Sequence, residues 1–202
     1  MLELKVKSID RVWFGVSYRA RLVEATNFGY SESELIKSLL NMVPYNEPFQ
    51  INSEPSPFAD GILSLMKSVY DGKGSARKIS FDLGRLPIFT QNVLKTVSQI
   101  PLGYVASYGG VSEAAGGGAR AVGNVMAANP FAPIIPCHRV VTSNLGLGGY
   151  GGGLKTKLQL LQREKQGFTK TERIPIGDRN LHVFPVELVL GKLEGTNLNY
   201  QQ

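Results

Sequence analysis

The stretch IIPCHRVV, residues 134–141, holds the only cysteine of a 202-residue chain. An apolar run leads into Cys137, Pro136 restricts the backbone just before it, and His138 follows directly. The thiolate is the nucleophilic form of cysteine, and we expect His138 and nearby helix ends to lower the pKa of this thiol. The other interpretation is a buried strand that ends in an inert, packed thiol, since free cysteine behaves as a small hydrophobe.

A helix-turn-helix is predicted upstream of the cysteine. Short helices are expected over residues 107–115 and 119–128, with Gly116-Gly117-Gly118 as the turn between them. The second helix carries mostly small side chains, so it can lie close to a nucleic-acid groove or pack tightly against its neighbours. The pattern of small residues alone favours neither the nucleic-acid contact nor the tight packing. Before this pair, Thr90 is expected to cap a helix whose apolar face runs from Val93 to Ile100.

Downstream of the cysteine, six of the eight residues 146–153 are glycines. They lack the Gly-Lys-Ser/Thr ending of a phosphate-binding loop, and a loop that folds closely around a flat ligand explains them at least as well. A last helix is predicted from Leu154 to about Gln166. Residues 169–202 differ in composition from the residues before them. The apolar run 181–190 predicts a strand or a short packed segment, and a polar end follows it.

Residues 1–84 predict a small α/β domain without a chemical motif. Two antiparallel strands are expected within residues 11–28 and one more over 78–83. Ser31 and Glu34 form a capping box for a helix that ends near Pro44, and residues 58–69 predict a second amphipathic helix after a proline-rich loop. A linker is expected near residues 84–87.

Composition restricts the classes of protein that remain. The formal net charge is +6, and between Leu83 and Arg163 the only acidic residue is Glu113. The segment around the cysteine is therefore basic, as a surface that binds a polyanion requires. One cysteine forms no internal disulfide, and two distant histidines give no metal spacing. Without an apolar run of about 18 residues or a signal-peptide core, the chain is expected to be intracellular, in the cytoplasm or at the nucleoid.

Residues 136–141, Pro-Cys-His-Arg-Val-Val, resemble the active-site motif of the O6-alkylguanine-DNA alkyltransferases. Proteins of this family repair DNA by moving an alkyl group from guanine onto their own cysteine. The resemblance covers residues 88–167, because further motifs stand in the family's order on both sides of the cysteine. These are Ala106-Ser107-Tyr108, residues 119–123, Asn129-Pro130, residues 150–153 and Glu164.

The resemblance implies an α/β (α+β) fold of two domains. Residues 1–84 would form the small N-terminal α/β domain, with a ribonuclease H-like sheet and helices. Residues 85–168 would form a mostly helical catalytic and DNA-binding domain with a winged-helix-like helix-turn-helix. Residues 169–202 lie beyond the usual end of the family and form an extension without an assigned role.

The resemblance also implies roles at the site. Cys137 would accept the alkyl group, and His138 would reach Glu164 through a water-bridged chain of hydrogen bonds. Asn129 would hold the cysteine turn, and Tyr108 would donate to guanine as it leaves. Arg120 would enter the base stack in place of the flipped nucleotide. The implied DNA-binding residues are Thr90, Tyr108, Arg120, Ala121, Gly123 and Ser143. The implied pocket residues are Met126, Val140, Tyr150, Gly151 and Lys157.

The implied reaction is a single displacement in duplex DNA. The alkylated base must first leave the helix, and the thioether product cannot be hydrolysed, so each molecule acts once. O6-alkylguanine is the implied substrate, with O4-alkylthymine as a second candidate. We expect no metal, no organic cofactor and no membrane partner, and we expect a monomer that binds double-stranded DNA.

Some positions depart from the family's pattern. Ala127 stands where many relatives carry a basic residue, and Gly149 and Gly151 replace larger polar residues, which puts the alkyl-size preference in doubt. The first domain lacks the cysteine and histidine ligands that bind zinc in some relatives. Three alternatives stay open: a lesion-binding protein without transfer activity, a helix-turn-helix regulator with an incidental cysteine, and a cysteine hydrolase. The hydrolase is disfavoured, since its histidine is usually distant in sequence.

Overall fold

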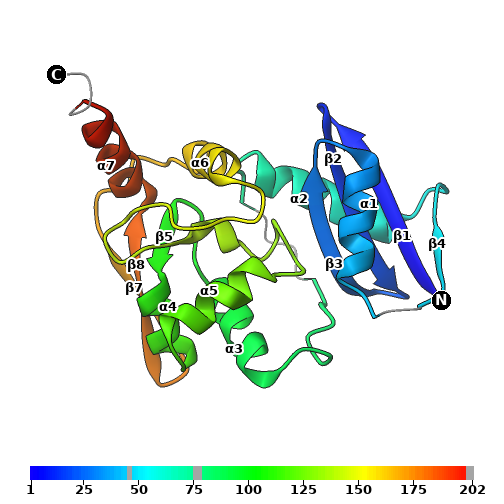
Figure 1. The fold of residues 1–202 in the computed structure, drawn as a ribbon, viewed down its shortest axis with the longest axis horizontal. Helices are drawn as coiled ribbons and strands as arrows, with labels where there is room; N and C mark the ends of the chain where they lie inside the picture. Colours follow the sequence, from blue (N-terminus) through cyan, green and yellow to red (C-terminus); the bar gives the residue numbers. More distant parts are fainter. Residues whose placement is uncertain (45–46, 75–78, 199–202) are drawn as a thin grey trace. The chain divides into compact units, whose positions relative to one another are not determined.

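The computed structural model describes residues 1–44, 47–74 and 79–198 (Figure 1). The chain folds into two compact units. The first comprises Met1–Arg85 and Pro130–Ile134, and the second comprises Leu86–Asn129 and Ile135–Gln202. Each unit contains one four-stranded sheet, so the predicted mixed α/β architecture is confirmed.

The sheet of the first unit has the strand order β3-β2-β1-β4. Its strands are β1 (Leu2–Ile9), β2 (Val12–Arg19), β3 (Leu22–Gly29) and β4 (Phe49–Ile51). The predicted antiparallel pair is β2 and β3, and β1 joins β2 antiparallel while β4 joins β1 parallel. The sequence did not predict β1 or β4. The alternation of Lys5 and Lys7 with apolar residues is a strand pattern that was not assigned to β1. In β4, all three residues are exposed.

Two helices cover opposite faces of this sheet. In α1 (Glu32–Asn41), Leu39 packs with Leu2, Leu4 and Ala25 of the strands. In α2 (Pro57–Tyr70), Tyr70 meets the ring of Phe14 edge-on, with the ring centroids 5.5 Å apart. The predicted cap of α1 is confirmed, because the Ser31 hydroxyl accepts from the Glu34 amide.

The strand predicted over residues 78–83 does not form within the described residues. Phe81 makes a single bridge to Val23, and Lys78 lies outside the described residues. The amide of Val23 donates to the Ser80 carbonyl, and the Asp82 amide donates back to the Val23 carbonyl. The segment is therefore tied to the sheet edge at one position only.

The second unit surrounds the cysteine with helices and a small sheet. Its helices are α3 (Ile88–Val97), α4 (Tyr108–Ala115), α5 (Ala119–Ala127), α6 (Leu154–Arg163), α7 (Val186–Leu198) and the 3₁₀ helix η1 (Cys137–Arg139). Its strands are β5 (Tyr104–Ser107), β6 (Val140–Val141), β7 (Glu172–Ile176) and β8 (Arg179–Pro185), in the order β6-β5-β8-β7. Strand β5 therefore lies between β6, which follows the cysteine turn, and β8.

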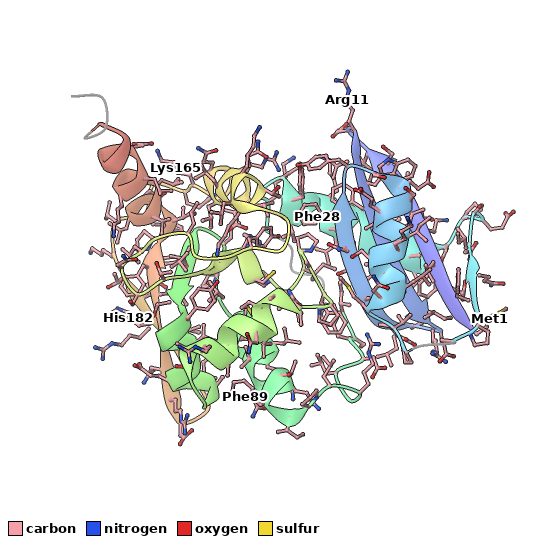
Figure 2. All side chains as sticks on the ribbon, viewed as in Figure 1. Met1, Arg11, Phe28, Phe89, Lys165 and His182 are labelled. Atoms are coloured by element: carbon pink, nitrogen blue, oxygen red, sulfur yellow. The ribbon has the colours of Figure 1, made fainter. Side chains whose placement is uncertain are left out.

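The helix-turn-helix prediction is confirmed by α4 and α5. The Ser107 hydroxyl accepts from the Gly110 amide and caps α4. At Gly117, in the turn, φ is +85°, and an added Cβ would lie 2.5 Å from the Phe89 ring of α3, which is labelled in Figure 2. Only glycine fits both conditions. One detail was wrong: α3 begins at Ile88 with Pro87 before it, so Thr90 lies inside the helix and does not cap it.

The described part of the extension, residues 169–198, belongs to the second unit. Strand β8 pairs with β5, and β7 pairs with β8, so this part of the chain completes the sheet (Figure 1). From α7, Val186, Val189 and Leu190 join a core with Val141 and Leu161. The extension thus packs against the strand that follows the cysteine turn and against α6. Among the described residues, the helices are too short and too polar for any of them to be a candidate membrane span.

Candidate active site

The cysteine sits on a tight turn. Cys137 opens the 3₁₀ helix η1, its own amide donates to the Ile135 carbonyl at 2.8 Å, and the Arg139 amide donates to the Pro136 carbonyl at 2.9 Å. Asn129 secures the same turn, because its Nδ2 donates to the Ile135 carbonyl at 2.9 Å. The role expected for Asn129 therefore has a direct structural basis. The apolar run before Cys137 forms no strand, and the strand β6 follows the cysteine instead.

Behind the turn lies a buried cluster of His138, Arg139 and Glu164. Arg139 grips the Glu164 carboxylate with two hydrogen bonds of 2.8 Å, from Nε to Oε2 and from Nη2 to Oε1. Its Nη1 donates to the Ile100 carbonyl at 2.7 Å. His138 Nε2 lies 2.9 Å from Glu164 Oε1, so the expected water bridge between His138 and Glu164 is wrong and the contact is direct. The sequence did not single out Arg139.

The charges of this cluster fix the state of the imidazole. Burial raises the pKa of Glu164, but the contacts with His138 and Arg139 outweigh it and hold the pKa at about 2. Burial lowers the pKa of His138. Glu164 is therefore an ionised acceptor beside a neutral imidazole, which must carry its proton on Nε2. The other nitrogen, Nδ1, is buried and has no hydrogen-bond partner among the described residues.

The thiol itself is less acidic than predicted. Burial raises the pKa of Cys137, and the hydrogen bond with Asn129 and the charge of Lys157 offset only part of this effect. The expectation of a low pKa was therefore wrong for the protein without DNA. Its physical cause is desolvation, which sequence neighbours do not reveal. The resting site holds a protonated thiol beside a neutral histidine with an open lone pair.

A cavity of about 730 Å³ opens at the cysteine. It is lined by side chains from α5 and by the loop that follows β6, together with Tyr108. Of the predicted residues, Cys137, Tyr108, Arg120, Gly123, Met126, Tyr150 and Gly151 line it; Asn124, Thr142 and Gly148 line it too and were not predicted. Burial raises the pKa of Tyr108, so its hydroxyl keeps the proton that a donor needs.

Lys157 lies beneath this loop and not in the cavity wall. Its ammonium group is fully buried and donates to the carbonyls of Val140 at 2.6 Å, Leu147 at 2.5 Å and Gly149 at 3.3 Å. The Tyr108 hydroxyl also donates to the Gly149 carbonyl, at 3.4 Å. Burial lowers the pKa of Lys157 to about 8. One cation therefore joins the strand after the cysteine to the loop that closes the pocket, which gives Lys157 a positioning role.

Replacing Lys157 with methionine is expected to loosen that loop. The variant keeps the apolar stem but removes the ammonium donor from all three carbonyls, of which Gly149 keeps only the long contact with Tyr108, at a cost of about 2 kcal/mol in the free energy of unfolding. We expect alkylation of Cys137 by free O6-benzylguanine to slow roughly tenfold, since both pocket shape and the nearby positive charge are lost. Urea unfolding and mass spectrometry measure the two effects.

The matched control is Lys155→Met, two residues earlier on the same helix, where the side chain is exposed. Equal behaviour of the two variants would contradict the positioning role of Lys157.

The remaining predicted residues lie apart from the pocket. Val140 is buried next to the turn, and neither Thr90 nor Ser143 lines the cavity. Ala121 is partly exposed on α5 and is also absent from the cavity wall. Among the described residues, His, Cys, Asp and Glu side chains form no group of three that could hold a metal ion.

Comparisons with known proteins all find methyltransferases that are named for O6-methylguanine or for methylated DNA. Residues 88–166 match the family model for the DNA-binding domain of 6-O-methylguanine DNA methyltransferase. The chain is 38% identical over 122 residues to the methylated-DNA–protein-cysteine methyltransferase of Mycobacterium tuberculosis, covering 59% of this chain and 73% of that protein. It is 28% identical over 158 residues to the protein of the same name from Thermococcus kodakarensis, covering 76% and 88%.

Solved structures agree with the sequence comparisons. The O6-methylguanine methyltransferase of Mycobacterium tuberculosis superposes with a TM-score of 0.63 at 27% identity, over 82% of this chain and 93% of that one. A second structure, of the Mycobacterium tuberculosis protein in complex with DNA, gives a TM-score of 0.64 over 81% and 92%. The similarity thus extends over both units.

Proposed function

This chain belongs to the O6-methylguanine DNA methyltransferase family, and we propose that it repairs O6-methylguanine in DNA by transferring the methyl group to Cys137. One observation carries the proposal. Cys137 lies at a cavity of about 730 Å³, and the next residue, His138, is a buried neutral imidazole with an unused Nδ1. This arrangement supports the proposed roles of Cys137 as nucleophile, of His138 as general base and of the cavity as the site of the flipped nucleobase.

The thiol proton passes to His138 Nδ1 through a bridging water as the reaction begins, since Nδ1 makes no direct hydrogen bond with the described residues. The imidazolium that forms is stabilised by Glu164, which Arg139 keeps ionised. This is the logic of a catalytic triad, in which a third group orients the base and stabilises its charge. Because burial keeps Cys137 protonated at rest, the thiolate forms only as it is used.

The transfer is a displacement at the methyl carbon. A bond forms between the Cys137 sulfur and this carbon, the bond between the carbon and O6 breaks, and its electron pair leaves with guanine. Tyr108, which lines the pocket, donates its hydroxyl proton to the departing guanine and is reprotonated from solvent, while His138 releases the thiol proton to solvent. The thioether is not hydrolysed, so the protein acts once.

Access to the base requires extrusion from the duplex. The methyl group lies inside the stack, and flipping the nucleotide costs roughly a few kcal/mol of unstacking. We propose that Arg120, which is exposed near the start of α5 and lines the pocket, fills the vacated space. Ala121 and Gly123 on α5, together with Thr90 and Ser143, are proposed to meet the DNA backbone.

The pocket also bears on substrate range. Gly149 and Gly151 line it without side chains, beside the apolar side chains of Met126 and Tyr150. We propose that it accepts alkyl groups larger than methyl, and that O4-alkylthymine is a second substrate. Membership of the family leaves the regulator and the hydrolase without support, and the presence of Cys137, His138 and Glu164 disfavours a binding protein without transfer activity.

The proposal predicts a stoichiometric reaction. A duplex with one O6-methylguanine, carrying a labelled methyl group, is incubated with limiting protein, and label bound to protein is counted. We expect one methyl group per molecule and no further uptake when fresh duplex is added. Repeated turnover would contradict the single displacement, and the absence of transfer would contradict the proposed function.

A further inference from the structure

The β7–β8 hairpin lies against the helix-turn-helix. The family model matches residues 88–166, and the hairpin, residues 172–185, follows that range in the chain. At its tip, Arg179 Nη1 donates to the carbonyl of Glu113 at 2.9 Å, in the last turn of α4. The hairpin and the start of the DNA-facing turn are therefore joined by a direct contact.

The register of the hairpin gives its two faces different characters. Arg179, Leu181 and Val183 share one face of β8, and the latter two are buried. Arg173 pairs with His182 on the other face, where both side chains are exposed, and His182 is labelled on the hairpin in Figure 2. Two arginines of one hairpin thus face in opposite directions, and only Arg179 faces α4.

The helix-turn-helix itself is poor in positive charge. Residues 107–128 contain one basic residue, Arg120, and one acidic residue, Glu113. The turn between the helices consists of Gly116, Gly117 and Gly118, which offer no side chain, and at Gly117 the close approach of Phe89 leaves no room for one. A duplex-binding element draws most of its affinity from cations that neutralise phosphates.

The guanidinium group of Arg179 lies beside the glycine turn, which has no cation of its own. A Cβ added to Gly116 would lie 3.9 Å from its Nη1 atom. The bond to Glu113 uses one N–H, and a guanidinium group has five, so this exposed side chain keeps donors for a second acceptor. A planar group with several donors matches the geometry of a phosphate.

We propose that the β7–β8 hairpin is a second DNA-binding element, in which Arg179 contacts a phosphate of the duplex backbone beside the helix-turn-helix. The inference rests on the proposed function, since it takes duplex DNA as the partner. It gives residues 172–185 a role in affinity that is independent of sequence, because phosphate contacts carry no base information.

Salt titration of the full-length protein tests this role. Binding to an undamaged duplex is followed by fluorescence anisotropy between roughly 50 and 200 mM salt. For Arg179→Ala we expect about tenfold weaker binding at the low end and a slope of log K against log salt shallower by about 0.9, as for one lost phosphate contact. Arg179→Lys keeps the charge and is expected to keep the slope. Arg173→Ala, on the other face of the hairpin, is the matched control and is expected to match the unmodified protein.

The outcomes separate the possible roles. An unchanged slope for Arg179→Ala, with or without a lower melting temperature, would overturn the proposal and leave Arg179 as a cap of α4. Equal losses for Arg173→Ala and Arg179→Ala would overturn it as well, because they would indicate a general effect of charge. Transfer of methyl from an O6-methylguanine duplex to the unmodified protein is measured in parallel, so failure of the proposed function is recognised separately.

Discussion

Replacing Glu164 with glutamine is expected to lower the free energy of unfolding by about 3 kcal/mol. Glutamine nearly matches the size of the side chain, but it leaves the buried Arg139 without a counter-charge and puts an NH2 donor in place of one of the two oxygens that accept from Arg139 and His138. Methyl transfer is expected to fall at least about 100-fold, since the imidazolium that takes the thiol proton loses its stabilising carboxylate. Urea unfolding and single-turnover rates measure the two effects.

The control is Glu113→Gln, which changes the exposed acid at the end of α4. Its side chain lies outside the cluster, and only its backbone carbonyl accepts from Arg179. We expect its stability to stay within about 0.5 kcal/mol of the unmodified protein. If Glu164→Gln were as stable as Glu113→Gln, the buried cluster would not support the site as described.

The same cluster makes the protein sensitive to acid. The pKa of Glu164 falls from its ordinary 4.5 to about 2 on folding, so its stabilising effect is complete above pH 4.5 and is lost as pH falls toward 2. The pKa of His138 also falls on folding, so stability begins to decline below its ordinary value of 6.5. Both shifts act in the same direction, and the Glu164→Gln variant is expected to show a smaller decline between pH 4.5 and 2.

Replacing Arg120 with alanine is expected to slow repair in duplex DNA roughly 100-fold, while the reaction with free O6-benzylguanine changes far less. Arg120 is exposed at the rim of the pocket, near the start of α5. Its proposed role is to fill the gap left by the extruded nucleotide. A free base requires no extrusion, so only the duplex reaction depends on this side chain.

Two second-order rate constants for each variant check this separation. Lys95→Ala, which removes an exposed cation from α3 outside the pocket, is the matched control and is expected to affect neither substrate strongly. Equal slowing of both reactions by Arg120→Ala would assign Arg120 to the shape of the pocket and contradict a role in base flipping.

The sequence predicted those parts of the fold that local patterns encode. The capping box at Ser31 and the glycine turn after α4 are recognised from residues adjacent in sequence, so the start of α1 and the end of α4 were predictable. Strand β4 was missed because three exposed residues are too few for an alternating pattern to indicate a strand; only pairing with β1 makes it one. The extension was left without a role because its strands are defined by pairing with β5, about eighty residues earlier in the chain.

In the candidate site, too, local motifs were predictable and contacts between distant residues were not. The motif around Cys137 indicated the proposed nucleophile, and the order of the neighbouring motifs indicated Glu164 and Tyr108 as members of the candidate site. The bidentate contact of Arg139 with Glu164 joins residues 25 apart and was not predicted, although an arginine within the mostly apolar stretch 134–141 was a signal for a buried ion pair. The direction of the Cys137 pKa shift failed for a related reason, since burial depends on the whole unit.

Peptide mass spectrometry after reaction with an O6-methylguanine duplex tests the central claim most directly. Equimolar protein and duplex are incubated, the protein is digested, and the peptide that contains Cys137 is sequenced, with Cys137→Ala as the control. The account predicts one methyl group on Cys137, near-complete modification and no methylation of the control. A methyl group on any other residue, or transfer that persists in Cys137→Ala, would contradict it.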